Sequence, residues 1–215
     1  MSRLRFTISM SLDGFSAGPD QSVEHPLGVG SERLHEWAFA LKIFREMHGM
    51  DGGEVNDSTA VVEESLANIG ATIMGRNMFG GHPGPWDVKQ PWNGWWGAEP
   101  PYHHPVFVLT HYPRAPLHLE GTTFTFITEG IDVALQKARH AAAGKDVSLA
   151  GGAKAFQEYF RAGLVDEMLI NIAPILIGSG ERLFERIGHD LRGMKLVRTV
   201  ATPLVTHLKF AKTGG

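Results

Sequence analysis

The chain has 215 residues, 43% of them apolar, and a formal net charge of −3 with both signs dispersed along it. This length suits one α/β domain or two small ones, and the apolar content is enough for a sizeable core. The lack of a basic stripe argues against a nucleic-acid partner. The sequence has no cysteine, which excludes disulfides and thiolate metal sites and fits a cytoplasmic protein.

The first predicted element is a strand over residues 4–10, where apolar residues alternate with other residues. No long apolar run is present around it, so we expect neither a signal peptide nor a membrane span. Ser31 is predicted to cap a helix that runs to about His48. Five apolar residues at helical spacing would form its buried face: Leu34, Trp37, Ala38, Leu41 and Phe44.

A second helix is predicted to end at Gly70, because glycine is typical of helix C-termini. Its apolar positions are Val61, Val62, Leu66 and Ile69. The short apolar stretch 71–75 then predicts a buried strand.

Residues 80–104 form a long irregular segment rich in proline and tryptophan. An aromatic segment of this length either stacks on a planar substrate or fills an interface between two copies of the chain. We expect a homodimer and keep both roles for the segment open.

The second half of the chain alternates strands and helices before a final hairpin. Strands are predicted over 105–110, 122–128, 146–150 and 165–178 (interrupted at Pro174), helices over 132–142 and 152–162, and two strands within 193–212. We therefore expect one domain over residues 1–215. It would have a mixed, mainly parallel sheet flanked by helices and a C-terminal antiparallel hairpin.

Several common catalytic and nucleotide-binding motifs are absent. The chain has no P-loop, no G-x-S-x-G elbow and no H-E-x-x-H helix. Gly178 and Gly180 begin a G-x-G, but Leu183 replaces the third glycine of the dinucleotide fingerprint. We interpret the adjacent His103 and His104 as loop-packing residues and expect no metal site.

Two adjacent glycines, Gly151 and Gly152, lie where the strand 146–150 gives way to the helix 152–162. A helix N-terminus at the carboxyl end of a parallel strand offers free N–H groups to a phosphate. Bare backbone there would let a pyrophosphate approach, and Lys154 would add positive charge. The alternative is a tight turn that binds nothing.

Four stretches in chain order resemble the dihydrofolate reductase-like superfamily. They are ISMSLDGFSAG, ATIMGRNMF, VFVLTHYPR and SLAGGAKAFQEYFRAGLVDEMLINIAPILIGSGERLFE. The chain is most similar to the reductase domain of the bifunctional riboflavin-biosynthesis deaminase-reductase and to its stand-alone relatives. The resemblance covers nearly the whole chain.

The resemblance implies the three-layer α/β fold of dihydrofolate reductase and NADPH-dependent hydride transfer to a C=N or C=O bond of a small heterocyclic or related molecule. The implied cofactor-binding residues are Gly151, Gly152 and Ala153 at the pyrophosphate, Gly75, Arg76, Asn77 and Met78 at a second helix N-terminus, Thr110, His111 and Arg114 at the adenosine 2′-phosphate, and Ser9, Ser16 and Ala17 at the nicotinamide. Arg76 could instead make a surface ion pair, and Asn77 could simply cap a helix.

Two acidic residues are candidates for contact with substrate or for proton supply. Asp57 lies near the place where dihydrofolate reductase has an acid that orients the pterin, although it could equally be a helix cap. Asp13 is the other candidate, and its alternative role is a turn. Ala150 stands where the riboflavin enzyme has an acidic residue, so we expect a different substrate. A non-catalytic NADP(H)-binding module is the alternative function.

Overall fold

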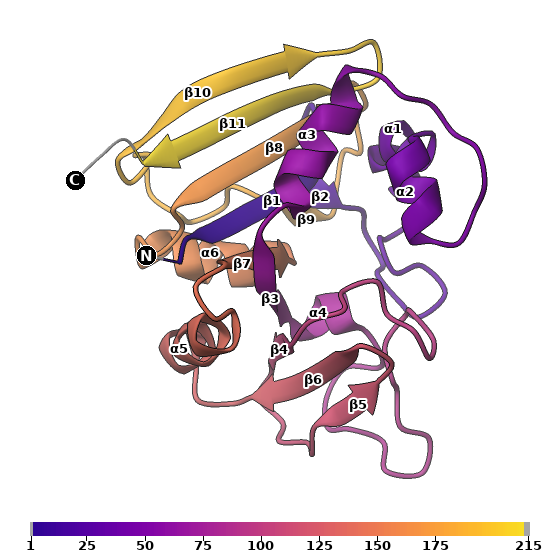
Figure 1. Cartoon of the computed structure of the whole chain (residues 1–215), viewed down its shortest axis with the longest axis vertical. Helices are drawn as coiled ribbons and strands as arrows, with labels where there is room; N and C mark the ends of the chain where they lie inside the picture. The colour runs from indigo at the N-terminus through magenta and orange to yellow at the C-terminus, as the bar shows by residue number, and fades with distance from the viewer. Residues whose placement is uncertain (1, 213–215) are drawn as a thin grey trace.

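The computed structural model describes residues 2–212 and confirms a mixed, mainly parallel sheet. The strands of the large sheet are β1 (Leu4–Ser11), β3 (Ile69–Gly75), β4 (Val106–Leu109), β5 (Leu117–Leu119), β6 (Thr122–Ile127), β7 (Asp146–Gly151), β8 (Glu167–Ala173), β10 (Met194–Ala201) and β11 (Thr206–Lys212). Their order is β10-β11-β8-β1-β7-β3-β4-β6-β5, with β10 and β5 at the two edges (Figure 1).

The central strands from β8 to β6 run parallel, and β11, β10 and β5 are antiparallel to their neighbours. The carboxyl ends of the parallel strands therefore meet at one edge of the sheet, where ligands bind in open α/β sheets. A small second sheet, which the sequence did not predict, pairs β2 (Phe15–Ala17) with β9 (Glu181–Arg182).

Helices cover both faces of the large sheet. They are the 3₁₀ helix η1 (Glu32–Leu34), α1 (Glu36–Phe39), α2 (Lys42–Met47), α3 (Asp57–Leu66), α4 (Arg76–Phe79), α5 (Ile131–Ala141) and α6 (Ala153–Arg161). The main core lies between the sheet and the pair α5 and α6. On the opposite face, Arg5 of β1 donates hydrogen bonds to the carbonyls of Glu64 and Ala67 at the end of α3.

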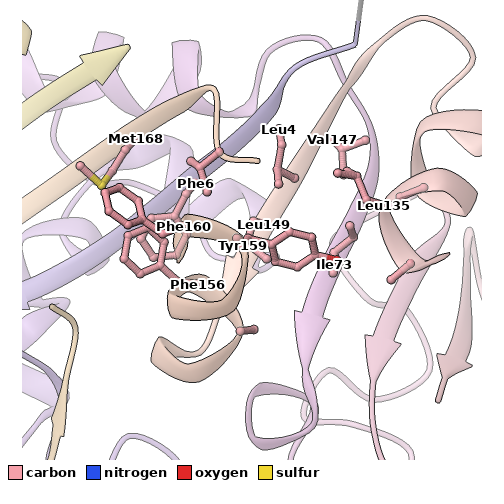
Figure 2. Close-up of a cluster of buried hydrophobic side chains, with 14 of the residues drawn as sticks. Leu4, Phe6, Ile73, Leu135, Val147, Leu149, Phe156, Tyr159, Phe160 and Met168 are labelled. Carbon is pink, nitrogen blue, oxygen red and sulfur yellow. The ribbon is translucent and has the colours of Figure 1, made fainter. Parts of the chain in front are cut away.

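The alternation of β1 explains this arrangement. Leu4 and Phe6 point into the core, where the ring of Phe6 stacks on Phe156 of α6 at 4.0 Å between centroids (Figure 2). Arg5 points to the other face and pairs with Glu167 of β8 at 3.1 Å. One strand thus separates an apolar layer from a polar one, as the period of two requires.

The predicted helix over residues 31–48 is wrong in part, because the chain breaks into η1, α1 and α2. At Leu41 the backbone is extended, with ψ of 138°. Glu54 donates to the carbonyl of Ala40 and accepts from the N–H of Lys42. These two hydrogen bonds to Glu54 use backbone groups of Ala40 and Lys42 that a continuous helix would need. Leu41 itself stays fully buried.

The assignment of Gly70 as a helix stop is also wrong. Helix α3 ends at Leu66, and Gly70 lies inside β3. A Cβ atom there would come within 2.6 Å of the carbonyl oxygen of Ala142. Glycine is therefore required by a close approach of two segments rather than by a helix end.

The strand predicted over 165–178 is shorter, since β8 ends at Ala173 just before Pro174. The predicted hairpin is confirmed as β10 and β11. The antiparallel edge strand β5 was not predicted, and its three residues are too few to give a pattern.

The tryptophan-rich segment packs within the chain. Trp86, Trp92 and Trp96 lie against a second apolar cluster that includes Phe79 and Phe124. The indole N–H groups of Trp92 and Trp95 donate to the carbonyls at the end of α4. The segment thus covers the β4–β6 part of the fold. Because its rings pack within the chain, they give no argument for a homodimer, which stays a prediction. In residues 2–212, no helix has the length and apolar character needed to span a membrane.

Replacing Phe156 with alanine should destabilise the protein by about 3–5 kcal/mol, because it leaves a cavity beneath a fully buried stacked ring. Phe184→Ala is the matched control, since Phe184 touches the same ring from a 41% exposed position. It should cost about 1 kcal/mol or less. Denaturant unfolding measures both, and equal losses would contradict this description of the core.

Candidate functional site

The carboxyl ends of β3 and β7 meet at three glycines. A Cβ on Gly75 would lie 3.4 Å from the Cβ of Ala155 and 3.6 Å from the carbonyl oxygen of Gly151. Gly151 has φ of +116°, a conformation that side chains rarely adopt, and its peptide bond to Gly152 is cis. The fold therefore needs glycine at position 151 for its own backbone.

Gly152 differs from Gly151 in its backbone φ and in the open space around it. Its φ is −75°, and a Cβ there would meet no atom within 4 Å. It immediately precedes α6, and no side chain caps this helix. The first N–H groups of a helix have no partner inside it. Open space in front of them fits an approaching pyrophosphate.

Lys154 and Ala153 open the first turn of α6. Ala153 is buried, whereas the side chain of Lys154 is exposed and lies 3.6 Å from the carboxylate of Glu181. The ammonium group is near the glycine junction, but one carboxylate already offsets part of its charge.

Arg76 and Arg114 come together around one indole ring. Their guanidinium carbons lie 3.7 Å and 5.0 Å from the ring centroid of Trp86. Partial burial, followed by the charge of Arg114, lowers the pKa of Arg76. In residues 2–212 neither arginine has a carboxylate within ion-pair distance, so the two charges could be offset by a bound anion.

Both guanidinium groups are anchored by hydrogen bonds to the segment that covers them. Arg76 donates to the carbonyl of His82, and Arg114 donates to Trp92 and to the side chain of Asn93. In the sequence, Trp86 is one of several tryptophans in the segment 80–104. Its stacking partners could not be predicted from the sequence, because Arg76 belongs to α4 and Arg114 to the loop after β4.

The remaining cofactor-side residues lie close by in the chain but differ in exposure. Thr110 is buried, and its hydroxyl accepts from the N–H of Tyr112. His111 and Asn77 are exposed, and Met78 is half-buried. A Cβ on Gly151 would lie 3.7 Å from the sulfur of Met78, so the structure brings α4 against the glycine junction. Gly75 directly precedes α4, and no side chain caps this helix.

The three residues implied for the nicotinamide are buried, and their side chains offer few free polar groups to a ligand. Ser16 donates its hydroxyl to the carbonyl of Glu181, and Ala17 pairs with the same residue in the small sheet. The hydroxyl of Ser9 accepts from the indole N–H of Trp37. Contacts to a ligand would therefore fall to backbone groups.

Asp13 ties the turn after β1 to the loop after β8. Its carboxylate accepts hydrogen bonds from the hydroxyl of Ser11 and from the N–H groups of Ile177 and Gly178. The bond from Ser11, with those from the two backbone groups, holds the pKa of Asp13 below its ordinary value of 3.8. A carboxylate held in this way is ionised and is poorly suited to donate a proton.

Asp57 lies elsewhere, on the wall of a groove of about 390 Å³. The groove is bounded by the start of α3, by Trp37 and by the turn that joins β10 to β11. In residues 2–212, no hydrogen bond or ion pair involves the carboxylate of Asp57. The alternative that Asp57 caps the helix is wrong, because Asn56 accepts from the N–H of Ser58 and forms a capping box with Thr59.

Three polar side chains form a row behind this groove. Ser9 of β1, Asn171 of β8 and His207 of β11 are direct neighbours across adjacent strands. One ring nitrogen of His207 lies 2.7 Å from Oδ1 of Asn171, and the other lies 2.9 Å from the hydroxyl of Ser58. Burial, followed by the charge of Arg198, lowers the pKa of His207 to about 4.

The sequence prediction missed most of the groove. Glu54, Thr202 and Leu204 come from loops, and Trp37 was predicted only as a core residue. The one available signal was the stretch NDST at 56–59, which contains the spacing of a helix cap. In residues 2–212, no group of three or more histidine or carboxylate side chains is arranged to hold a metal ion.

The family model described as "RibD C-terminal domain" matches residues 3–208 of this chain. No curated protein matches the chain. Among solved structures, a putative riboflavin biosynthesis protein from Shewanella sp. PV-4 has 20% identity and a TM-score of 0.63, with 100% of each chain covered.

Two further structures have the same fold. Dihydrofolate reductase from Enterococcus faecalis, solved with NADP(H) and RAB-propyl, has 13% identity, a TM-score of 0.53 and coverage of 99% of this chain and 97% of that one. A diaminohydroxyphosphoribosylaminopyrimidine deaminase/5-amino-6-(5-phosphoribosylamino)uracil reductase from Thermotoga maritima has 14% identity and a TM-score of 0.54, and the match covers 99% of this chain but 57% of that chain. These likenesses confirm the expected dihydrofolate reductase-like fold.

The hydrogen bonds that Asp13 accepts lead to a prediction about how the stability of the protein depends on pH. Asp13→Asn should lower the melting temperature at pH 7, since a neutral amide accepts the hydrogen bonds from Ser11, Ile177 and Gly178 less strongly. The folded-state pKa is depressed. The extra stability of the wild type over Asp13→Asn is therefore present at pH values above the ordinary carboxyl pKa. It is lost as pH falls through the lower pKa that Asp13 has in the folded state.

Thermal unfolding from pH 7 down to pH 2 measures this difference. Asp51→Asn is the exposed control that should show no such pattern, since no hydrogen bond or ion pair in residues 2–212 involves the carboxylate of Asp51. If Asp13 contacts substrate instead, turnover should fall in Asp13→Asn while the melting temperature stays unchanged.

Proposed function

The chain belongs to the family of the RibD C-terminal domain, and on that premise we propose that it is an NADPH-dependent reductase. It would transfer a hydride to a C=N or C=O bond of a small heterocyclic or related molecule. The observation that carries the proposal is Gly152, a glycine in an ordinary backbone conformation with open space in front of an uncapped helix. A Cβ there would meet no atom within 4 Å, and a bound pyrophosphate would account for the bare backbone at this position.

The residues around the junction suit the parts of a dinucleotide. The N–H groups at Gly152, Ala153 and Lys154 would hold the pyrophosphate. Arg76 and Arg114, with no carboxylate partner in the described part of the chain, would pair with the adenosine 2′-phosphate. Backbone groups of Ser16 and Ala17 would hold the carboxamide of the nicotinamide.

The substrate would lie in the groove at the start of α3. When bound, the cofactor supplies the hydride, and the protein contributes alignment in a site that excludes water. Strand β1 lies between β7, which ends at the glycine junction, and β8. Its Ser9 contacts Trp37 of the groove. Adjacent strands therefore connect the two halves of the proposed site.

Proton supply would depend on Asp57. Its carboxylate is exposed and without a partner in residues 2–212, whereas Asp13 accepts hydrogen bonds from three donors. Asp57 could orient a donor group of the substrate or pass a proton from solvent. If Asp57 serves neither purpose, the chain would be a non-catalytic NADP(H)-binding module.

A panel of pterins, pyrimidines and small enones, incubated with NADPH and followed by nicotinamide absorbance, distinguishes these two functions. Oxidation of NADPH that depends on one panel member identifies a reductase. Tight NADPH binding without turnover on any member supports the binding module, and failure to bind NADPH contradicts both.

Replacing Gly152 with valine should weaken NADPH binding by about a hundredfold or more, because the side chain displaces a pyrophosphate from several charge-assisted hydrogen bonds at once. Gly152→Ala should give a smaller loss of the same kind. Both variants should keep the wild-type melting temperature, since φ at position 152 is ordinary and a Cβ there would meet no atom within 4 Å. Calorimetric titration and thermal unfolding are the measurements.

Gly151→Ala is the contrasting variant for that experiment. It should lower the melting temperature, because Gly151 has φ of +116°. A melting temperature that falls in Gly152→Val while its NADPH affinity is intact would mean that both glycines serve only the turn.

The paired arginines predict the choice of cofactor. NADPH should bind at least tenfold tighter than NADH, a difference of about 1.4 kcal/mol that one arginine–phosphate contact can supply. Arg114→Gln should bring the two affinities close together, while Arg161→Gln, which removes the same charge from the end of α6, should not. Equal affinities of the wild type for NADPH and NADH would contradict the assignment.

A further inference from the structure

Asn93 is directly followed by a glycine, and the chain has no other Asn-Gly pair. The backbone nitrogen of the residue after an asparagine can attack the side-chain amide carbon and close a five-membered ring. Glycine hinders this attack least, because it has no Cβ and the least restricted backbone. Larger residues follow the other asparagines, which are Asn56, Asn68, Asn77 and Asn171. Asn93 is therefore the asparagine at which the sequence most favours the ring.

Gly94 cannot be exchanged for a residue that would slow this attack without strain in the fold. Its φ is +92°, and a Cβ there would lie 3.0 Å from the ring of Trp96. Trp96 in turn stacks on Phe124 of β6, with 5.8 Å between the ring centroids. The packing of the tryptophan-rich segment therefore requires the glycine, and the glycine completes the reactive pair.

The attacking nitrogen and the departing amide group are both free. Residues 91–94 lie outside every helix and strand, and the side chain of Asn93 is exposed. Within residues 2–212, the N–H of Gly94 donates no hydrogen bond, and neither does the side-chain NH₂ of Asn93. No backbone pairing has to break before the two groups meet.

Arg114 contacts the third atom of the reaction, which is the side-chain oxygen of Asn93. Its Nη2 lies 2.8 Å from Oδ1, and because a guanidinium group can only donate, the oxygen rather than the NH₂ faces it. Negative charge builds up on this oxygen when a nitrogen attacks Cγ. A cationic donor at that place stabilises the charge, as the donors of an oxyanion hole do.

We propose that Asn93 is a site of spontaneous deamidation and that the carboxylate formed there pairs with Arg114. The backbone nitrogen of Gly94 loses its proton and bonds to Cγ of Asn93, the bond from Cγ to Nδ2 breaks, and ammonia leaves a succinimide ring. Water then opens the ring to aspartate or isoaspartate. The net reaction consumes one water and releases one ammonia, with no oxidation or reduction.

The product changes the charge around the paired arginines. In the described part of the chain, neither Arg76 nor Arg114 has a carboxylate within ion-pair distance, so the new one would be their first. Its effect on the cofactor rests on the proposed function, in which these arginines bind the 2′-phosphate of NADPH. A carboxylate at position 93 competes with that phosphate for Arg114, whereas NADH has no 2′-phosphate to lose.

Peptide mapping by mass spectrometry tests the reaction on the full chain, incubated without cofactor at neutral pH and at about pH 9. Aspartate and isoaspartate should form at position 93 at least about tenfold faster than at Asn68 and Asn77, which are also exposed. The rate should rise with pH, because the attacking nitrogen must lose a proton. Arg114→Gln should slow the reaction about fivefold, and the matched variant Arg161→Gln should not.

Asn93→Asp supplies the product directly and tests the pairing. By NMR titration, the pKa of its new carboxylate should lie below the ordinary value, and adding Arg114→Gln should raise it again. This measurement needs no cofactor. Asn68→Asp is the matched control, because it adds the same charge at an exposed position between α3 and β3, and its pKa should not respond to Arg114→Gln.

Cofactor titrations then measure the consequence. Asn93→Asp should bind NADPH about tenfold more weakly than the wild type and should bind NADH nearly as the wild type does. Asn68→Asp should leave the ratio of the two affinities unchanged. Incubated wild type should approach Asn93→Asp as deamidation proceeds, so the test survives if that variant folds poorly. Asn93→Gln, which closes the corresponding larger ring slowly, should keep its initial affinity during incubation.

Two results would overturn the proposal. One is deamidation at position 93 that is no faster than at Asn68 and Asn77, and the other is a carboxylate in Asn93→Asp whose pKa ignores Arg114→Gln. The map and the NMR titration contain no NADPH, so a wild type that fails to bind NADPH contradicts the reductase and leaves both readings standing. A wild type that prefers NADPH, with the same preference in Asn93→Asp, contradicts only the effect inferred for the carboxylate.

Discussion

The parallel pairing of β3 with β7 is the constraint on which the rest of the site depends. It brings Gly75 against Gly151, so closely that a Cβ on Gly75 would touch Ala155 of α6. With the two strand ends in contact, α4 and α6 both start at the same edge of the sheet. The first N–H groups of α6 have no partner inside the helix, and a Cβ on Gly152 would meet no atom within 4 Å. The positive φ of Gly151 helps to set the direction in which the chain enters the helix.

The alternation of β1 connects this junction to the groove. Its apolar side chains build the core with α6, whereas Arg5 and Ser9 face α3 and Trp37. The polar face of β1 carries the ion pair of Arg5 with Glu167 at one end. At the other end, Ser9 begins the buried row that continues through Asn171 to His207. Buried polar groups of this kind are tolerated only where each finds a partner, so the row also fixes how α3 and the β10–β11 hairpin sit against the sheet.

The tryptophan-rich segment has a supporting role in this arrangement. Trp86 stacks on Arg76 and lies near Arg114, and the carbonyls of the segment accept hydrogen bonds from both guanidinium groups. Planar guanidinium groups stack on indole faces and keep their donors at the edge. The segment thus holds two like charges close together without a carboxylate in the described part of the chain, which is the electrostatic basis for expecting an anion there.

Local patterns in the sequence determined the alternating strands, the long helices α3, α5 and α6, the final hairpin and the glycine junction, because each depends on residues close in the chain. Only the tertiary structure decided the rest. The break at Leu41 follows from hydrogen bonds to Glu54, and the glycine at position 70 follows from contact with Ala142. The separation of Asp13 from Asp57 has the same origin, since one carboxylate is held by the loop after β8 and the other lines a groove closed by the β10–β11 turn. Partners so far apart in the chain leave no periodicity or spacing, so the sequence alone could name both acids but could not assign either its role.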